Sequence, residues 1–154
     1  MSSKNLPSLF LVYLGGRAKN AHIEQHDLCW VVGYKIEDTF PKLREIWFGN
    51  QFGLHMDSYM RINYIDGFKI NLEPISNGLY TDINKFNEPE NSLWFVNLGG
   101  YDPSCFSEIH KFFLIVTTSA SQAKQLAMNR WKDKFLQKHR DDLYPLGNSL
   151  EVDE

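Results

Sequence analysis

The sequence predicts an α+β fold of two pseudo-equivalent ββαβ(β) halves, which together form one domain with mixed sheets and two main helices. Three observations lead to this prediction. Sliding the chain along itself by 84 residues gives twelve identities over 61 positions, where chance gives roughly four. Each half contains two short apolar runs followed by a helical pattern. The chain has only 154 residues, and half of it alone would bury little surface, so we expect one domain.

The internal match sets the boundaries of the predicted organisation. Repeat one covers residues 8–72, a connector rich in Pro, Gly and Asn covers 73–91, and repeat two covers 92–154, all within a single domain 1–154. The matched pairs include Gly15/Gly99, Gly16/Gly100, Glu24/Glu108, His26/His110, Trp47/Trp131, His55/His139 and Asp57/Asp141. Histidine and tryptophan are rare residues, so their recurrence strengthens the case for a duplication.

Two strands open each repeat. The first is an apolar run at 9–14, with its copy at 93–98, and a Gly-Gly pair stops each run. The second lies at 28–32, with its copy at 112–116. Their hydrophobicity is continuous rather than alternating, which predicts strands covered on both faces, by the helix and by the partner half.

A helix follows the second strand of each repeat. In the first repeat Thr39 caps it, Pro41 lies in its first turn and Gly49 ends it. In the second, Ser119 or Ser121 is the cap. Its inward stripe is Ala120, Ala123, Ala127 and Trp131. The tryptophan pair is expected to anchor the helices in the core.

After the first helix, alternating residues at 60–64 and 68–72 flank Asp66-Gly67, which predicts a hairpin. The corresponding part of repeat two alternates poorly, and Pro145 indicates an edge strand.

Composition excludes several classes of function. The formal charge of −3 gives no broad basic surface, so nucleic acid is not an expected partner. The early apolar run at 9–14 is far shorter than a membrane span, and we expect neither a leader nor a membrane partner. The basic run from Lys124 to Arg140 is interpreted as a solvated helix face. Cys29 and Cys105 are interpreted as buried free thiols in a cytoplasmic protein, and a monomer is expected rather than a homodimer.

Polar matched residues gather before the predicted strands. If the second and third strands of a repeat are parallel, their starts share one sheet edge, joined there by the Gly-Gly end of the first strand. The candidate polar cluster is Glu24, His26, Asp27, His55 and Asp57, repeated as Glu108, His110, His139 and Asp141, with loop glycines Gly15, Gly16, Gly99 and Gly100.

This cluster has two interpretations. Imidazoles and carboxylates bind divalent transition metals, with His26, His55 and Asp57 as the ligands to consider, or they form an acid–base pair. Alternatively they cap strand starts and tie down the Gly-Gly loop. No tight ligand spacing supports the metal, so we favour the structural interpretation, assign no metal ligand and no catalytic residue, and expect no cofactor. The loop from Gly15 to Lys19 lacks a phosphate-loop frame and is interpreted as solvated.

Specific stretches resemble a known family. Tyr13-Leu-Gly-Gly-Arg17, Ile23-Glu-Gln-His-Asp27 and Leu54-His-Met-Asp-Ser-Tyr59, with their second-half counterparts Val96–Tyr101, Glu108–His110 and His139–Tyr144, are similar to the bacterial family catalogued as domain of unknown function 1543. The resemblance implies two copies of the domain and a bacterial origin, and it implies no activity. Lys111 stands in the second copy where the first has Asp27, so a site that needs this acid would be asymmetric.

We therefore expect a small cytosolic bacterial protein that is a non-enzymatic binding or interaction module with unidentified partners. The alternative is a metal-dependent hydrolase that uses the Glu/His/Asp edge of one or both halves. The two hypotheses differ in one measurable respect: only the second requires the side chains at that edge to hold a metal ion.

Overall fold

The computed structural model of the protein describes residues 6–72, 91–132 and 137–146. The chain forms two compact units. Unit 1 comprises Met1–Tyr64, Lys69–Ile75 and Leu150–Glu154, and unit 2 comprises Ile65–Phe68 and Ser76–Ser149. These units correspond closely to the two predicted repeats. That the halves form one domain, and that each covers the other's sheet, stay predictions. The connector 73–91 lies almost entirely outside the described residues.

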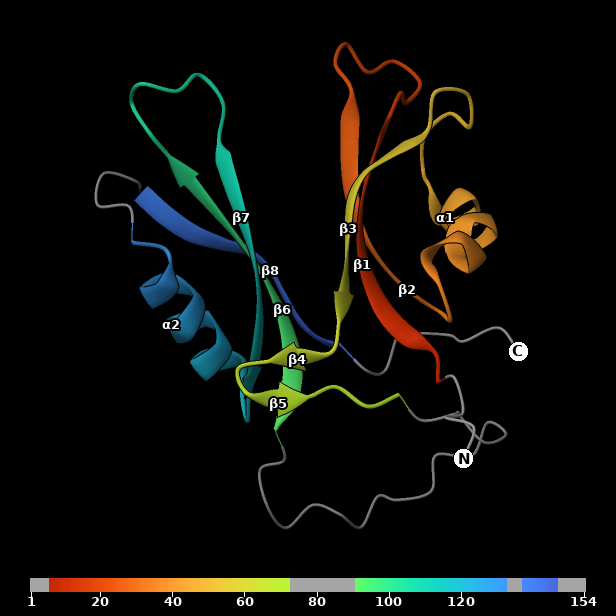
Figure 1. The fold of residues 1–154 in the computed structure, drawn as a ribbon. Coiled ribbons are helices and arrows are strands. Elements are labelled where there is room, and N and C mark those ends of the chain that lie inside the picture. The colour runs from red at the N-terminus through yellow and green to blue at the C-terminus, as the bar shows by residue number, and fades with distance from the viewer. Residues whose placement is uncertain (1–5, 73–90, 133–136, 147–154) are drawn as a thin grey trace, which may run out of the picture. The chain divides into compact units, whose positions relative to one another are not determined.

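Unit 1 is a three-stranded sheet with one helix (Figure 1). Its elements are β1 (Ser8–Gly16), β2 (Gln25–Gly33), the 3-10 helix η1 (Ile36–Thr39), α1 (Phe40–Ile46) and β3 (His55–Ile62). The strand order is β2-β1-β3, and both outer strands are antiparallel to β1. The outer strands β2 and β3 therefore run in the same direction, and both start at the Gly-Gly end of β1.

Unit 2 repeats this topology with β6 (Ser92–Tyr101), β7 (Ile109–Thr117), α2 (Ala120–Arg130) and β8 (Gln137–Leu146), in the order β7-β6-β8. The predicted hairpin is present only around its turn, as β4 (Tyr64–Ile65) and β5 (Phe68–Lys69), because residues 60–62 belong to β3 and pair with β1. The turn residues Asp66 and Gly67 have φ of 53° and 84°. Glycine adopts such values freely and Asp more readily than most residues. The α+β class with ββαβ halves is confirmed.

Each unit has its own apolar core. In unit 1, Phe10, Val12 and Leu14 of β1 cluster with Leu43 and Trp47 at the helix. In unit 2 the stripe Ala123, Ala127 and Trp131 clusters with Val96, Leu98 and Ile115. The tryptophans are 4% and 1% exposed, so the prediction that they anchor the helices is confirmed. Ser119 caps α2, since its hydroxyl accepts a hydrogen bond from the amide of Gln122.

Several expectations need correction. His26 lies within β2, and His55 and Asp57 lie within β3, rather than before these strands. Their copies in unit 2 likewise lie within β7 and β8. The four glycines expected in loops are strand residues: Gly15 and Gly16 belong to β1, and Gly99 and Gly100 belong to β6. Cys29 is buried as expected, but Cys105 is exposed. Neither helix in the described part of the chain is long and apolar enough to cross a membrane.

A β-bulge occurs at the same place in both units. In unit 1 the register between β1 and β3 shifts after Tyr13, which pairs with Ser58, while Leu14 pairs with Met56. Asp57 is therefore the extra residue of β3. In unit 2 the same shift makes Asp141 the extra residue of β8. Bulges re-aim side chains locally, and here each one involves a carboxylate of the candidate cluster.

Candidate functional site

Four polar side chains in unit 1 surround Gly15. Gly15 pairs with His26 on β2 and with His55 on β3, so the two imidazoles flank it on either side. Glu24 lies two residues before His26, and strand alternation points both side chains to the same face. Asp57 at the bulge completes the set. We call Glu24, His26, His55 and Asp57 quartet 1.

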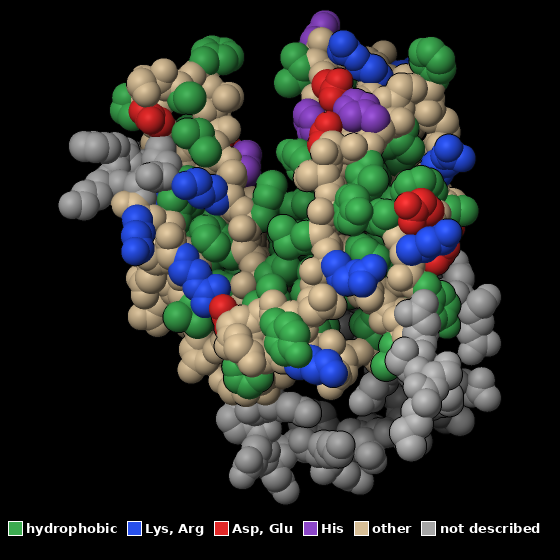
Figure 2. Space-filling view, viewed as in Figure 1, with side chains coloured by type: hydrophobic (Ala, Val, Ile, Leu, Met, Phe, Trp, Pro, Cys, Tyr) green, Lys and Arg blue, Asp and Glu red, His purple; other side chains and the backbone are tan. Residues whose placement is uncertain are grey.

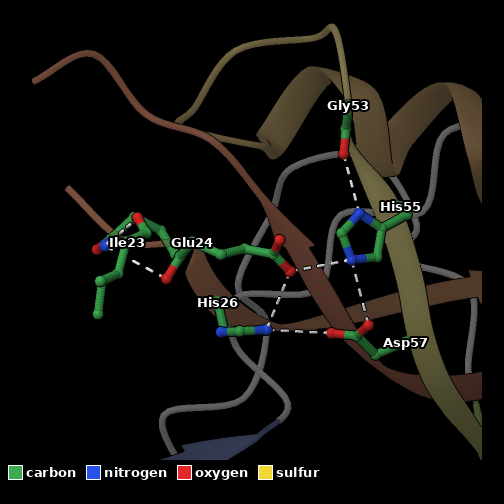
Figure 3. A network of polar contacts seen from close by, with 7 residues as sticks. Ile23, Glu24, His26, Gly53, His55 and Asp57 are labelled. Atoms are coloured by element: carbon green, nitrogen blue, oxygen red, sulfur yellow. Dashed lines mark hydrogen bonds and ion pairs between the residues drawn. The ribbon is translucent and has the colours of Figure 1, made fainter. Parts of the chain in front are cut away.

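The quartet forms a closed ring of alternating nitrogen and oxygen contacts (Figure 3). Nε2 of His55 lies 3.1 Å from Oε1 of Glu24 and 3.3 Å from Oδ1 of Asp57. Nε2 of His26 lies 3.5 Å from the same Glu24 oxygen and 3.3 Å from Oδ2 of Asp57. Both imidazoles thus present the same nitrogen to two carboxylates. The four side chains are 35–45% exposed, so solvent reaches them.

The absence of a side chain at Gly15 makes room for this ring. A Cβ built there would lie 2.8 Å from Nε2 of His55, 2.9 Å from Oδ2 of Asp57 and 3.0 Å from Oε1 of Glu24. Real Cβ atoms essentially never lie closer than 3.0 Å to such atoms. The presence of glycine at this position is therefore explained by the side-chain atoms that converge above it, and not by an unusual backbone conformation.

The protonation of His55 follows from its second nitrogen. Nδ1 lies 2.9 Å from the carbonyl oxygen of Gly53, which can only accept, so Nδ1 carries a proton. Nε2 then either carries the second proton of an imidazolium or offers a lone pair. The Gly53 hydrogen bond, followed by the charges of Glu24 and Asp57, raises the pKa of His55 above its usual 6.5. Metal-binding histidines commonly donate their other N–H to a backbone carbonyl in this way.

An aromatic ring lies beside each quartet. Tyr13 stacks on His26 with ring centroids 5.2 Å apart and planes at 12°. Burial, and to a smaller extent the charge of Asp57, raise the pKa of Tyr13, so its hydroxyl stays protonated at neutral pH. In unit 2, Tyr101 stacks instead on His139 at 5.8 Å. The tyrosine therefore stacks on the β2 histidine in unit 1 and on the β8 histidine in unit 2.

Unit 2 repeats the ring around Gly99 with Glu108, His110, His139 and Asp141, which we call quartet 2. Nε2 of His139 lies 2.8 Å from Oε1 of Glu108 and 2.9 Å from Oδ1 of Asp141. Nε2 of His110 lies 3.5 Å from Oε2 of Glu108 and 3.2 Å from Oδ2 of Asp141. A Cβ on Gly99 would come within 2.5 Å of Glu108 and 2.6 Å of Asp141.

One atom of quartet 2 is buried without a hydrogen bond. Oε1 of Glu108 has no hydrogen-bond partner among the residues that the structure describes, although Nε2 of His139 is close in distance. The two atoms form an ion pair when His139 is protonated. When His139 is neutral, a cation that both atoms face would stabilise this buried oxygen.

Within each unit the structure brings together four candidate polar residues, which accounts for eight of the nine. The exception is Asp27, which alternates to the other face of β2, where Oδ1 accepts a hydrogen bond from the Leu28 amide and Oδ2 lies 3.9 Å from Sγ of Cys29. Burial raises the pKa of Asp27 and raises that of the Cys29 thiol to about 12. Gly16 also differs from Gly15, because its Cβ would meet Trp47.

Sequence reasoning missed three participants. The Gly53 carbonyl could not be predicted from the sequence, since every residue has a backbone carbonyl. Tyr13 and Tyr101 stand at non-equivalent positions of the repeats, so self-comparison could not select them. Tyr13 was nevertheless detectable, because it is two residues before Gly15 on the same face of the first strand.

Donor geometry defines what the site can do. In each unit one histidine and two carboxylates offer ligand atoms that all lie within 4.8 Å of one another: Glu24, His55 and Asp57, or Glu108, His139 and Asp141. Ligands bound to zinc at about 2.0–2.1 Å are roughly 3.3 Å apart in a tetrahedron, which matches the 3.1–3.3 Å contacts of His55. His26 and His110 lie outside these compact groups, although Nε2 of each contacts both carboxylates of its quartet.

The surroundings of quartet 1 are open on one side and apolar on the other. Figure 2 shows histidine and acidic side chains together at the Gly-Gly end of unit 1, on the surface. Next to His55 a pocket of about 190 Å³ opens on the α1 side, lined mainly by apolar side chains that include Phe40, Leu54 and Met56.

Fold and site together define a class: a duplicated α+β protein in which each repeat carries one His/carboxylate quartet on a glycine of its central strand. The chain belongs to the family described as Domain of Unknown Function (DUF1543). The family model matches residues 21–72 and 105–151, which cover more than half of the chain and correspond to the two repeats. The family resemblance seen in the sequence is thereby confirmed.

A solved structure is similar over most of the chain. It is described as the crystal structure of a protein Il1583 from Idiomarina loihiensis, with 34% sequence identity and a TM-score of 0.63. The similarity covers 90% of this chain and 84% of that one. No curated protein matches the chain. These comparisons support the fold and the family and name no activity.

Proposed function

We propose that the protein is a divalent metal-binding module with one site per unit, formed by Glu24, His55 and Asp57 in unit 1 and by their equivalents in unit 2. The observation that carries the proposal is the glycine beneath each ring. In both units the donor atoms converge into space that a single Cβ would fill. A metal centre requires its ligand atoms to face one point, and the glycine leaves room for that convergence.

The donor set suggests which metal to test. One imidazole nitrogen and two carboxylate oxygens suit zinc, manganese or iron(II), because softer metals prefer sulfur ligands. His26, which contacts both carboxylates, orients them or joins as a fourth ligand after a small movement. The Gly53 carbonyl fixes His55 in the tautomer whose Nε2 is free to bind.

Metal content and zinc titration test the proposal. Protein purified without an affinity tag or chelator is expected to bind two equivalents of Zn²⁺ by calorimetry. His55→Ala and His139→Ala should each remove one equivalent and leave the circular dichroism unchanged. His22→Ala is the matched control, because His22 is exposed and is the one histidine of the five outside the quartets. Unchanged stoichiometry in both quartet variants, together with lower melting temperatures, would make the quartets scaffold.

A metal-dependent hydrolase is the second candidate, and one observation favours it. The quartet 1 side chains are 35–45% exposed, so a water molecule can reach a coordination position that protein ligands leave open. Zinc- or manganese-loaded protein would then hydrolyse activated esters or phosphodiesters, with activity lost in His55→Ala and kept in His22→Ala. Metal binding with no turnover above the free metal would leave the binding module as the function.

A further inference from the structure

The two units differ most at one place on their helix faces. In unit 1, Phe40, Leu54 and Met56 line the apolar pocket beside α1. The 84-residue repeat places three basic residues at the equivalent positions of unit 2: Lys124, Lys138 and Arg140. The equivalence is structural as well, because Leu14 pairs with Met56 in unit 1 and Leu98 pairs with Arg140 in unit 2.

Arg140 and Lys138 share the α2 face of the sheet in unit 2, and Lys124 lies on α2 at the position equivalent to Phe40. Leu98 belongs to the core beneath α2, so its neighbour Arg140 points to the α2 side, and two-residue alternation places Lys138 there too. Lys138 donates a hydrogen bond to the carbonyl of Trp131, and its Nζ lies 5.5 Å from the centre of that ring. Lys111 contacts the same ring at 5.4 Å. Figure 2 shows Lys and Arg side chains on this surface over β8 and α2.

We propose that this basic face, formed by Lys124, Lys138 and Arg140, binds a small anion with more than one phosphate group. Arg140 and Lys124 are exposed, and neither makes an ion pair with a carboxylate in the part of the chain that the structure describes. Arginine binds phosphate oxygens in pairs, and lysine adds a point charge. Trp131 is 1% exposed, and Nζ of Lys138 lies over its ring, which holds this lysine in place and lowers the entropy lost on binding.

The partial negative charge of the helix dipole opposes anion binding at this face. Lys138 lies at the C-terminal end of α2, where the helix dipole contributes roughly half a negative charge, whereas Lys124 lies near the middle of the helix. Lys138 already satisfies the Trp131 carbonyl there. Three full positive charges exceed that partial charge on this face, although the whole chain carries −3.

The small size of the face identifies the class of partner. Three clustered cations match a compact phosphate anion, whereas a nucleic acid needs charges spread along its backbone. The adjacent acidic residues Asp141 and Asp142 lie on the opposite face, Asp141 in quartet 2 and Asp142 bonded to Asn97. The inference is independent of the metal proposal, because the two ligands would occupy opposite faces of the sheet.

Calorimetry with inorganic pyrophosphate in excess chelator tests this inference. We expect one equivalent to bind the full-length protein, with affinity falling between 50 and 200 mM salt. Lys138→Gln/Arg140→Gln should weaken binding at least tenfold. The matched control Arg17→Gln/Lys19→Gln removes the same charge from the Gly-Gly loop of unit 1 and should change nothing.

Four results would overturn the inference: no binding, binding only when metal is present, equal loss in the control variant, or tighter binding of a short RNA than of pyrophosphate. Circular dichroism of both double variants establishes that they are folded. Since Lys138 and Arg140 are surface residues of an edge strand, we expect no change in the spectrum. Lys124→Gln alone supplies a third variant on a different element, with an expected loss of about threefold.

Discussion

Replacing Gly15 by Ala separates a binding site from a salt-bridged scaffold, because it adds one carbon where the donor atoms of quartet 1 converge. The new Cβ would lie 2.8–3.0 Å from atoms of His55, Asp57 and Glu24. To reach an ordinary contact of 3.4 Å, each atom must retreat by about 0.4–0.6 Å. Metal bonds tolerate displacements of only about 0.2 Å, so we expect Zn²⁺ affinity at this site to fall at least tenfold.

The cost of this change to folding should be small. The crowded atoms are the ends of flexible side chains that are 35–45% exposed, so they can move outward into solvent. Gly15 lies in extended strand, which alanine adopts readily, and replacing glycine lowers the entropy of the unfolded chain. We therefore expect the free energy of unfolding of the apo protein to change by no more than about 1 kcal/mol.

Zinc calorimetry and urea unfolding measure the two effects separately. Gly15→Ala should keep one zinc equivalent, bound by quartet 2, and should unfold at nearly the wild-type midpoint. Gly16→Ala is the reciprocal control, because its Cβ would press on Trp47 at 3.0 Å and leave the quartet alone. It should lose stability and keep both equivalents. Two unchanged zinc equivalents in Gly15→Ala would refute the steric argument, and an unfolded Gly15→Ala would show that the quartet is a rigid scaffold.

Three further outcomes are expected. Because the pKa of His55 is raised in the folded state, this residue stabilises the folded apo protein fully below pH 6.5, and the contribution is lost as the pH rises through the folded pKa. Zinc affinity should rise over the same pH range. Melting temperatures measured from pH 5.5 to 8.5 with and without zinc should therefore diverge, and parallel curves would contradict a shared site. A thiol reagent should modify the exposed Cys105 within minutes and Cys29 only on unfolding, since burial raises the Cys29 pKa to about 12; fast reaction of two thiols in folded protein would contradict this. Trp131→Ala should lower the free energy of unfolding by about 3–5 kcal/mol in urea titrations, because the ring is 1% exposed, and a loss below about 1 kcal/mol would contradict its role in the core.

Much of the fold was readable from the sequence because the duplication tested each pattern twice. The Ser119 cap and the Asp66-Gly67 turn are local signals that depend on few neighbours, and the structure contains both. Thr39 stands at the N-cap position of α1, but its hydroxyl donates a hydrogen bond to the Ile36 carbonyl and does not cap the helix. The Gly-Gly pairs lie within β1 and β6 and do not stop the strands before them. The start of β3 was predicted too late, since its first residues are polar and strand patterns are recognised by apolar alternation.

The sequence predicted which residues belong to the candidate site, but not how their side chains are arranged. The internal repeat selected the eight quartet residues, and the strand topology places each group of four at one edge of its own sheet. Asp27 was included because it adjoins His26, although alternation along a strand sends neighbours to opposite faces. The bulge left no sequence signal. The role of Gly15 was interpreted as that of a turn residue, because the donors above it come from two other strands.

The bulge at Asp57 also bears on how the protein moves. An extra residue interrupts the regular ladder of hydrogen bonds between β1 and β3, so its amide should exchange with solvent water faster than those on either side of it. A carboxylate on such a residue can shift without carrying the rest of the strand along. The sheet can thus stay rigid over nanoseconds while one ligand-bearing position samples several placements, and amide exchange at that single position would report on occupancy of the site.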